Sequence, residues 1–572
     1  MVQHHDKITP EFRGMWLASG TWPAQTSTAV ELPPVYAFIR NSAATTCATR
    51  LSPEEPRRRN SRPAASPCRG AHVSQPAAGS MSAAVVKGTS WTAASRFAVQ
   101  LLSIASTSIV ARHVLPHAYG LVGMAMVVIN FAGLFRDIGT VSAIIQRKEI
   151  DDFLLTSVFW LNMFLGAAVT GACWSAAPWV AAFYHEPQLV AVFRALGFSF
   201  PIWALGNVHV ALLSRHFQFS RVAAAEVGSG AAGLAVAVTG ALLGFGVWSL
   251  VAASLTNSVV ATLIAIVAKP WRPRLFFSWS QIRSISGFGL NLSAFNCVNY
   301  FARNADNMLV GKYIGAVALG YYGFSYNVML YPVMSIAQSL GRVLFPAFST
   351  IQSDDARFRQ AYLRSSAAIA FITFPLMAGA TILAPELIAV FLGPRWAPAV
   401  PVFRILAPVG MLQSLTALTG NIYLAKGATG ALFRWGTLFS SIFVLGFIAG
   451  LPWGIVGVAS SYAALTALLF VPTLAIPFRL IGLPLRALWK SLGPVVACTA
   501  AMAALVVGLR WVLVQLHTVA LAALPVCIAA GAVFYFILMF RARVAVFCDV
   551  LSMAAAHSSL INSFARRLRL VT

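Results

Sequence analysis

The chain has 572 residues, of which 58% are hydrophobic and 10% charged, and its mean hydropathy is +0.75. A soluble globular domain carries about 25% charged residues, so this composition excludes an ordinary soluble protein and predicts an all-α polytopic membrane protein. The net charge of +25 would suit nucleic-acid binding in a soluble protein. Here lysine and arginine gather in short loops, as in cytoplasmic loops of membrane proteins, so we expect no nucleic-acid partner.

The first 80 residues differ in composition from the rest of the chain. They are rich in Arg, Pro, Ser and Ala, as in "EEPRRRNSRPAASPCRG", and show no apolar periodicity, which is typical of disorder. Met81 is followed by a single lysine and then by an apolar stretch, a sensible beginning for a membrane protein. We therefore expect 1–80 to be a disordered leader that precedes the true translation start. The alternative is a genuine disordered cytoplasmic tail.

Apolar runs of membrane-crossing length follow one another along the remaining sequence, and they predict about fourteen transmembrane helices. Their ranges are 90–111, 118–135, 154–176, 192–213, 222–244, 247–268, 286–311, 318–340, 366–391, 402–424, 434–450, 454–476, 490–513 and 517–540. Basic residues fall in alternate loops, as with Arg136 and Arg147 after the second span, whereas the intervening loops, such as "GFG", carry almost no charge. This asymmetry predicts that both termini lie in the cytoplasm.

An internal duplication relates the two halves of the predicted bundle. A shift of 200 residues places "IVARHVLPHAYGLVGM" (109–124) on "LVGKYIGAVALGYYGF" (309–324), so that Arg112 meets Lys312 and Gly120 meets Gly320. "APWVAAF" (177–183) likewise resembles "APELIAVF" (384–391), at a slightly larger offset. Because each copy holds an even number of spans, both copies enter the membrane from the same side. Parallel repeats of this kind serve alternating access in transporters.

The duplication sets the expected domain organisation, which we list here. We predict an N-lobe of six helices at 85–283, a C-lobe of six helices at 284–480, two further helices at 481–545 and a basic cytoplasmic tail at 546–572.

One predicted span, 286–311, carries an unexpected stripe of polar residues along one helical face. It includes Asn296, Asn299, Arg303, Asp306 and Asn307, which are spaced by three and four residues. The corresponding face of the first span carries Arg96, Gln100 and Ser103. A charge in mid-membrane costs at least about 2.5–3.5 kcal/mol, and such residues normally face a bundle interior or a watery cavity.

These eight residues are therefore our candidate cavity residues. A guanidinium group grips phosphate through a bidentate fork, so a cavity containing arginine favours a phosphate-bearing ligand. The alternative is structural: Arg303 and Asp306 pair with each other, and the amides simply join neighbouring helices.

The sequence gives little support to catalysis. The seven cysteines are scattered singly, without CxxC or Cys/His clusters, so no metal site is indicated. Asp151-Asp152 and Asp354-Asp355 are acidic pairs in matching loops, where we expect solvated surface. Neither a glycine-rich phosphate loop nor a hydrolase motif is present. We therefore expect no enzyme activity, no cofactor and no metal.

Four segments resemble a known family: "KGTSWTAASRF" at 87–97, "ARHVLPHAYGLVGM" at 111–124, "NADNMLVGKYIGAVALGYYGFSYNV" at 304–328 and "RVLFPAFSTIQSDDARFRQAYLR" at 342–364. They are similar to the polysaccharide-transporter branch of the MATE/MOP flippase superfamily, and most similar to its Wzx-like exporters of the colanic-acid and xanthan type. The resemblance extends over roughly 85–540 and implies the MOP flippase fold, with two six-helix lobes and two extra C-terminal helices.

The resemblance also implies a function. Such a protein moves an undecaprenyl-diphosphate-linked oligosaccharide across the bacterial inner membrane for exopolysaccharide, capsule or lipopolysaccharide synthesis, with membrane lipid, a polymerase and a chain-length regulator as expected partners. A cationic cavity for the diphosphate is a family feature, which points to Arg303 and Arg96. The alternatives are a cation-coupled drug antiporter of the MATE type, a lipid II flippase, and an integral-membrane polysaccharide polymerase or glycosyltransferase. Short outward loops argue against the enzyme.

Overall fold

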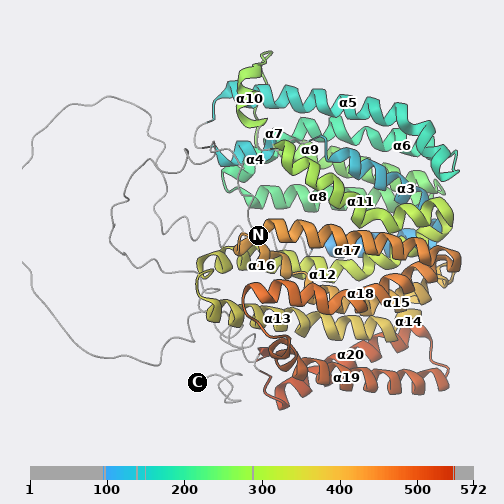
Figure 1. Ribbon diagram of the computed structural model, residues 1–572. Helices are drawn as coiled ribbons and strands as arrows, with labels where there is room; N and C mark the ends of the chain where they lie inside the picture. The colour runs from blue at the N-terminus through green and yellow to red at the C-terminus, as the bar shows by residue number, and fades with distance from the viewer. Residues whose placement is uncertain are drawn as a thin grey trace, which may run out of the picture. The chain divides into compact units, whose positions relative to one another are not determined.

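A computed structural model describes residues 95, 98–136, 140–147, 150–286, 289–544 and 546–547. Throughout this part of the chain the regular elements are helices (Figure 1). The predicted leader at 1–80 and nearly all of the predicted tail at 546–572 lie outside the described residues. Figure 1 labels most of the elements, which are listed next.

A helix at 98–113 comes first. The elements after it are α3 (Pro116–Gly133), α4 (Thr140–Gln146), α5 (Asp152–Tyr184), α6 (Leu189–Gly197), α7 (Ser199–Arg215), α8 (Phe219–Leu242), α9 (Val247–Ala268), α10 (Trp279–Ser286), α11 (Gly289–Tyr313), α12 (Ala316–Thr350), α13 (Asp355–Ile382), α14 (Ala384–Phe391), the short 3₁₀ helix η2 (Pro394–Trp396), α15 (Ala399–Thr416), α16 (Thr419–Ala425), α17 (Thr429–Gly450), the 3₁₀ helix η3 (Leu451–Trp453), α18 (Gly454–Leu480), α19 (Leu485–Gln515) and α20 (Ala520–Arg541).

The helices confirm the predicted class of the chain. Ten helical stretches among the described residues are long and apolar enough to cross a membrane, and one of them, Thr429–Leu480, holds both α17 and α18. Helices also occupy the predicted spans 286–311 and 318–340, as α11 and α12, although neither is among those ten. The chain is a multi-pass helical membrane protein, and the total of about fourteen spans remains a prediction.

Aspartates at two helix starts have a more specific role than the solvated surface that we expected. The Asp151 carboxylate accepts the backbone N–H of Leu154 at 2.9 Å, and that of Asp354 accepts the N–H of Arg357 at 3.1 Å. These bonds satisfy amide groups that have no partner within the first turn of a helix. The first residue of each acidic pair therefore caps a long helix, α5 in one copy and α13 in the other.

Prolines divide two of the predicted spans into two helices each. The predicted span 192–213 is broken between α6 and α7, where Pro201 has no N–H to donate to the Gly197 carbonyl one turn earlier. The predicted span 366–391 is broken between α13 and α14, and Pro385 stands in the first turn of α14. A proline there fixes the start of a new helix, because its missing N–H is not needed in a first turn.

The two predicted copies meet where α3 packs against α12. A Cβ atom added at Gly120 would overlap the backbone carbonyl of Ala316, and one added at Gly320 would overlap that of Pro116. Only glycine permits such close backbone approach. These two contacts are equivalent under the 200-residue offset, because Gly120 corresponds to Gly320 and Pro116 corresponds to Ala316. Such reciprocity is expected of two copies related by a two-fold axis, and it supports the predicted duplication.

A second reciprocal contact lies at the same end of these helices, where α3 begins and α11 ends; we call this the outer end. The Arg112 guanidinium donates to the backbone carbonyl of Val390. The Lys312 ammonium lies over the Phe183 ring, 3.8 Å from its centre. Arg112 corresponds to Lys312 in the sequence alignment of the two copies. When Ala177-Pro178 is aligned with Ala384-Pro385, Phe183 corresponds to Val390. Each copy thus anchors the basic end of its first helix on the matching segment of the other copy.

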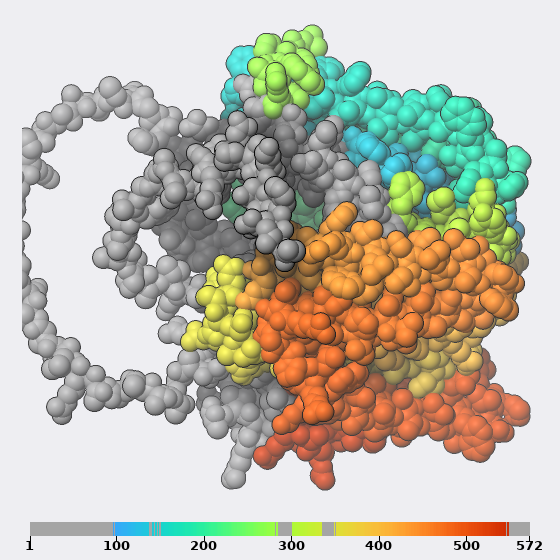
Figure 2. All heavy atoms as spheres, in the orientation of Figure 1, coloured from blue at the N-terminus to red at the C-terminus, as the bar shows by residue number. Residues whose placement is uncertain are grey.

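The last two helices attach to the second copy. α19 packs along α13, and α20 packs against α14 and α19. Arg510 of α19 forms an ion pair with Glu386 of α14, with 2.8 Å between Nε and Oε1. Figure 2 shows α17 and α18 across the middle of one face of the molecule, with α19 and α20 along one edge. Leu445 on α17 and Leu468 on α18 are 66% and 70% exposed, as expected of helices that face lipid rather than water.

Candidate functional site

A large cavity lies between helices of the two predicted copies. Its volume is about 2180 Å³, whereas pockets for small ligands measure about 300–1,000 Å³. The helix at 98–113 and α3, α7, α8 and α9 line it from the first copy, and α11 to α15 line it from the second. At its outer end the wall reaches Tyr119 and Gly320, beside the contact of α3 with α12. The cavity therefore has room for a cargo much larger than a drug-like molecule.

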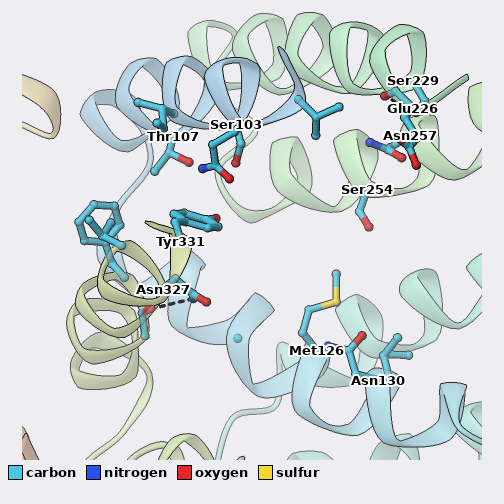
Figure 3. Close-up of a pocket in the computed structure, with 18 of the residues that line it drawn as sticks. Ser103, Thr107, Met126, Asn130, Glu226, Ser229, Ser254, Asn257, Asn327 and Tyr331 are labelled. Carbon is cyan, nitrogen blue, oxygen red and sulfur yellow. Dashed lines mark hydrogen bonds between the residues drawn. The ribbon is translucent and has the colours of Figure 1, made fainter. Parts of the chain in front are cut away.

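The wall of the cavity is rich in neutral hydrogen-bonding groups. Figure 3 shows Ser103 and Thr107 on the first helix, Asn130 on α3, and Asn327 and Tyr331 on α12, together with a cluster on α8 and α9. Its amide side chains are those of Gln100, Asn130, Asn207, Asn257, Asn304, Asn307 and Asn327. Amide groups both donate and accept hydrogen bonds, which suits a ligand that carries many hydroxyl groups.

Three residues of the wall have polar atoms that lack a hydrogen-bond partner among the residues that the structure describes. They are Gln100 Nε2, Tyr119 Oη and Asn207 Nδ2, each almost fully shielded. A buried donor without a partner costs about 1–3 kcal/mol, so such groups are unusual in packed helices. Two of the three are amide donors, which would reach a ligand only after a change in the packing around them.

Arg136 is the one cation among the described residues that line the cavity. It follows the C-terminal end of α3, and its guanidinium lies over the indole ring of Trp203 on α7, 4.2 Å from the ring centre. Stacking on an aromatic face holds the planar guanidinium in one orientation. This contact places the charge of Arg136 at the wall of the cavity.

The candidate residues of the first helix and α11 fall into three groups. Gln100, Ser103 and Asn307 line the cavity. Arg303 and Asp306 are not among its described lining residues. Arg96 lies outside the described residues, as do the side chains of Asn296 and Asn299, whose backbones belong to α11.

Arg303 and Asp306 do not form the ion pair that was the structural alternative, as far as the described residues show. Asp306 is 2% exposed, and its carboxylate accepts the Tyr322 hydroxyl at 2.9 Å and the Asn307 backbone N–H at 2.8 Å. The Arg303 side chain is exposed. Asp306 thus joins α11 to α12.

Sequence reasoning missed several residues of the cavity. Arg136 was interpreted only as a loop charge, and Glu226, Asn207 and Asn257 were not noticed within their apolar spans. One signal was available: Ser254, Asn257, Ser258 and Thr262 are spaced by three and four residues along α9 and all line the cavity, as expected of one helical face.

The helices and the cavity define the class of the protein: a membrane transporter that encloses a large cavity between two related sets of helices, with polar groups set into a mainly apolar wall. Residues 109–401, just over half of the chain, match the family described as polysaccharide biosynthesis protein. The chain belongs to this family.

Named relatives agree with the family. The lipopolysaccharide biosynthesis protein WzxC of Escherichia coli is 28% identical over 64% of this chain and 75% of its own length. The teichuronic acid biosynthesis protein TuaB of Bacillus subtilis is 28% identical over 80% of this chain and 95% of its own length. The fold matches the lipid II flippase MurJ in an inward closed conformation, with a TM-score of 0.61 and 14% identity, covering 79% of this chain and 98% of that one.

Proposed function

We propose that the protein moves oligosaccharide units linked to undecaprenyl diphosphate across the bacterial inner membrane, from the cytoplasmic to the outer leaflet. The observation that carries this proposal is the cavity of about 2180 Å³, with its amide-rich wall and a stacked arginine. The wall suits a glycan, and Arg136 suits a diphosphate. The relatives named for lipopolysaccharide and teichuronic acid biosynthesis support the same cargo class.

Alternating access between two lobes is the mechanism that this arrangement favours. The copies meet at the outer end through Gly120, Gly320 and Arg112. The cavity wall extends toward the opposite ends of the helices, to Arg136 on one side and Leu213 on the other. Since the basic loops predict that these opposite ends face the cytoplasm, the cavity would receive cargo from the cytoplasmic side. Opening the outer contact would then release it outward.

In this proposal the lobes are residues 85–283 and 284–480, both termini are cytoplasmic, and 481–545 flank the second lobe. A polymerase and a chain-length regulator would use the exported units.

The proposal is tested with the full chain in proteoliposomes that contain a fluorescent oligosaccharide on undecaprenyl diphosphate. A membrane-impermeant quencher measures how fast the label changes leaflet. The protein should accelerate this movement over protein-free vesicles. Acceleration for a cationic dye but not for the lipid-linked sugar would instead identify a drug antiporter, and lengthening of the glycan would identify a polymerase.

Arg303, with Arg96, remains a proposed contact for the diphosphate from its exposed position on α11. We expect Arg303→Ala to reduce export of the polymer without reducing the amount of protein in the membrane. The assay is export in a strain that lacks the gene, with membrane abundance measured by immunoblot. Arg434→Ala is the matched control, because Arg434 is also exposed and donates only to the Gly430 carbonyl of its own helix among the described residues. Export at the wild-type level in Arg303→Ala would remove this residue from the site.

A further inference from the structure

One wall of the cavity carries a cluster of polar side chains that the proposed function does not yet use. The cluster consists of Glu226 and Ser229 on α8 and Ser254 and Asn257 on α9 (Figure 3). α8 and α9 pack closely along each other, and on each helix the two residues are three positions apart, which places them on one face. The two helices therefore present a carboxylate, an amide and two hydroxyls to the same part of the cavity.

Glu226 is the one acidic residue among the described residues that line the cavity. It lies within a stretch that is apolar enough to cross a membrane, yet its side chain is exposed. Among the described residues, its carboxylate is in contact with Ser95, whose hydroxyl donates to Oε2 at 3.0 Å. A carboxylate at this depth usually pairs with a cation or lines a pathway for substrate. Here a neutral hydroxyl orients the carboxylate while leaving it open to the cavity.

The two charges of the described wall come from different helices, Arg136 after α3 and Glu226 on α8. An anionic cargo group is attracted to the arginine and repelled by the carboxylate. A sugar hydroxyl, in contrast, donates well to a carboxylate, and charge-assisted bonds of this kind are stronger than neutral ones. Asn257 adds a donor and an acceptor for neighbouring hydroxyls. The wall thus offers a cationic group suited to the phosphate end of a cargo and a carboxylate suited to its sugar end.

We propose that Glu226, together with Asn257, forms the glycan subsite and selects sugars that present neutral hydroxyls over sugars that carry a carboxylate. This inference rests on the proposed function, because it assigns the sugar end of the same lipid-linked cargo. Selection arises from repulsion as well as attraction: a uronic acid placed at Glu226 would bring two carboxylates together, and like charges at a contact act against the wrong partner.

The test uses the full chain in nanodiscs and two probes, undecaprenyl-diphosphate-linked disaccharides that differ only in a terminal glucose or glucuronic acid. We expect the wild type to bind the glucosyl probe at least about tenfold more tightly. Glu226→Gln keeps the shape of the side chain and removes its charge, so this variant should bind both probes equally. Asn257→Asp adds a second carboxylate and should increase the preference for glucose.

Glu186→Gln is the matched control, because Glu186 lies at the outer end, pairs with His117 at 3.3 Å and does not line the cavity. This variant should retain the wild-type preference. If the wild type binds both probes equally, or Glu226→Gln keeps the preference, the subsite assignment is overturned while the flippase function stands. If the wild type binds neither probe, the proposed function fails, and the subsite fails with it.

Discussion

Gly120→Ala is expected to stop polymer export while the protein remains in the membrane. The added methyl group would overlap the backbone carbonyl of Ala316, and a backbone atom within a helix cannot turn aside as a flexible side chain can. Overpacking of a well-packed contact costs about 1–3 kcal/mol. Because this contact closes the outer end of the cavity, we expect export to fall at least about tenfold. Export in a strain that lacks the gene and an immunoblot of its membranes are the two measurements.

The reciprocal contact supplies both a second variant and a control. Gly320→Ala should cause a similar loss, since its methyl group would overlap the Pro116 carbonyl. The double variant should be little worse than either single variant, because effects within one contact are not additive. Gly379→Ala is the control: Gly379 is also helical and has nothing within 4 Å of an added Cβ. Normal export in Gly120→Ala would show that α3 and α12 need not approach this closely during transport.

Arg136→Ala is expected to weaken binding of the lipid-linked diphosphate by about 10- to 100-fold. A hydrogen bond to a charged group contributes about 1.5–3 kcal/mol, and the alanine loses that bond. Arg136→Lys should restore only part of the affinity, since an ammonium cannot bind two phosphate oxygens with a planar fork. Trp203→Leu should also weaken binding, because the guanidinium loses the ring that orients it. Titration of the purified protein in nanodiscs measures each affinity.

Two controls test whether the loss of affinity in Arg136→Ala is specific for the diphosphate and for this arginine. The control probe is the same glycan on undecaprenyl monophosphate. For this probe, the difference in affinity between the wild type and Arg136→Ala should be smaller than for the diphosphate probe. Arg221→Ala serves as the control, because Arg221 begins α8 outside the cavity and its guanidinium donates to the Ala268 carbonyl. Equal diphosphate affinity in Arg136→Ala and wild type would exclude Arg136 as the phosphate contact.

The sequence predicts much of the helical arrangement because its signals are local or repeated. Apolar runs reveal the membrane helices, and the 200-residue offset identifies Gly120 with Gly320 before their contacts are seen. Helix breaks at Pro201 and Pro385 are harder to predict, since membrane helices often continue through proline. Pro178 and Pro408 do lie inside α5 and α15.

The candidate site is only partly predictable because a helix has several faces and tertiary packing decides which of them meets the cavity. The stripe on α11 illustrates this point: Asn307 lines the cavity, whereas Asp306, one residue earlier, is buried against Tyr322. Arg136 and Glu226 are isolated charges near or within apolar spans. Their importance follows from the cavity that they share, which no local pattern encodes.

The reciprocal contacts at the outer end bear on the origin of the chain. Gly120 meets Ala316 as Gly320 meets Pro116, and Arg112 is anchored on the second copy as Lys312 is on the first. Exchange of this kind is the defining property of an isologous interface, in which one surface patch pairs with its own copy across a two-fold axis. A half-length ancestor carrying this patch would have assembled as a homodimer with the same interface. Fusion of two such subunits would have freed each half to diverge, which would account for an acidic residue such as Glu226 in the wall that α8 contributes, with no acidic counterpart among the described lining residues.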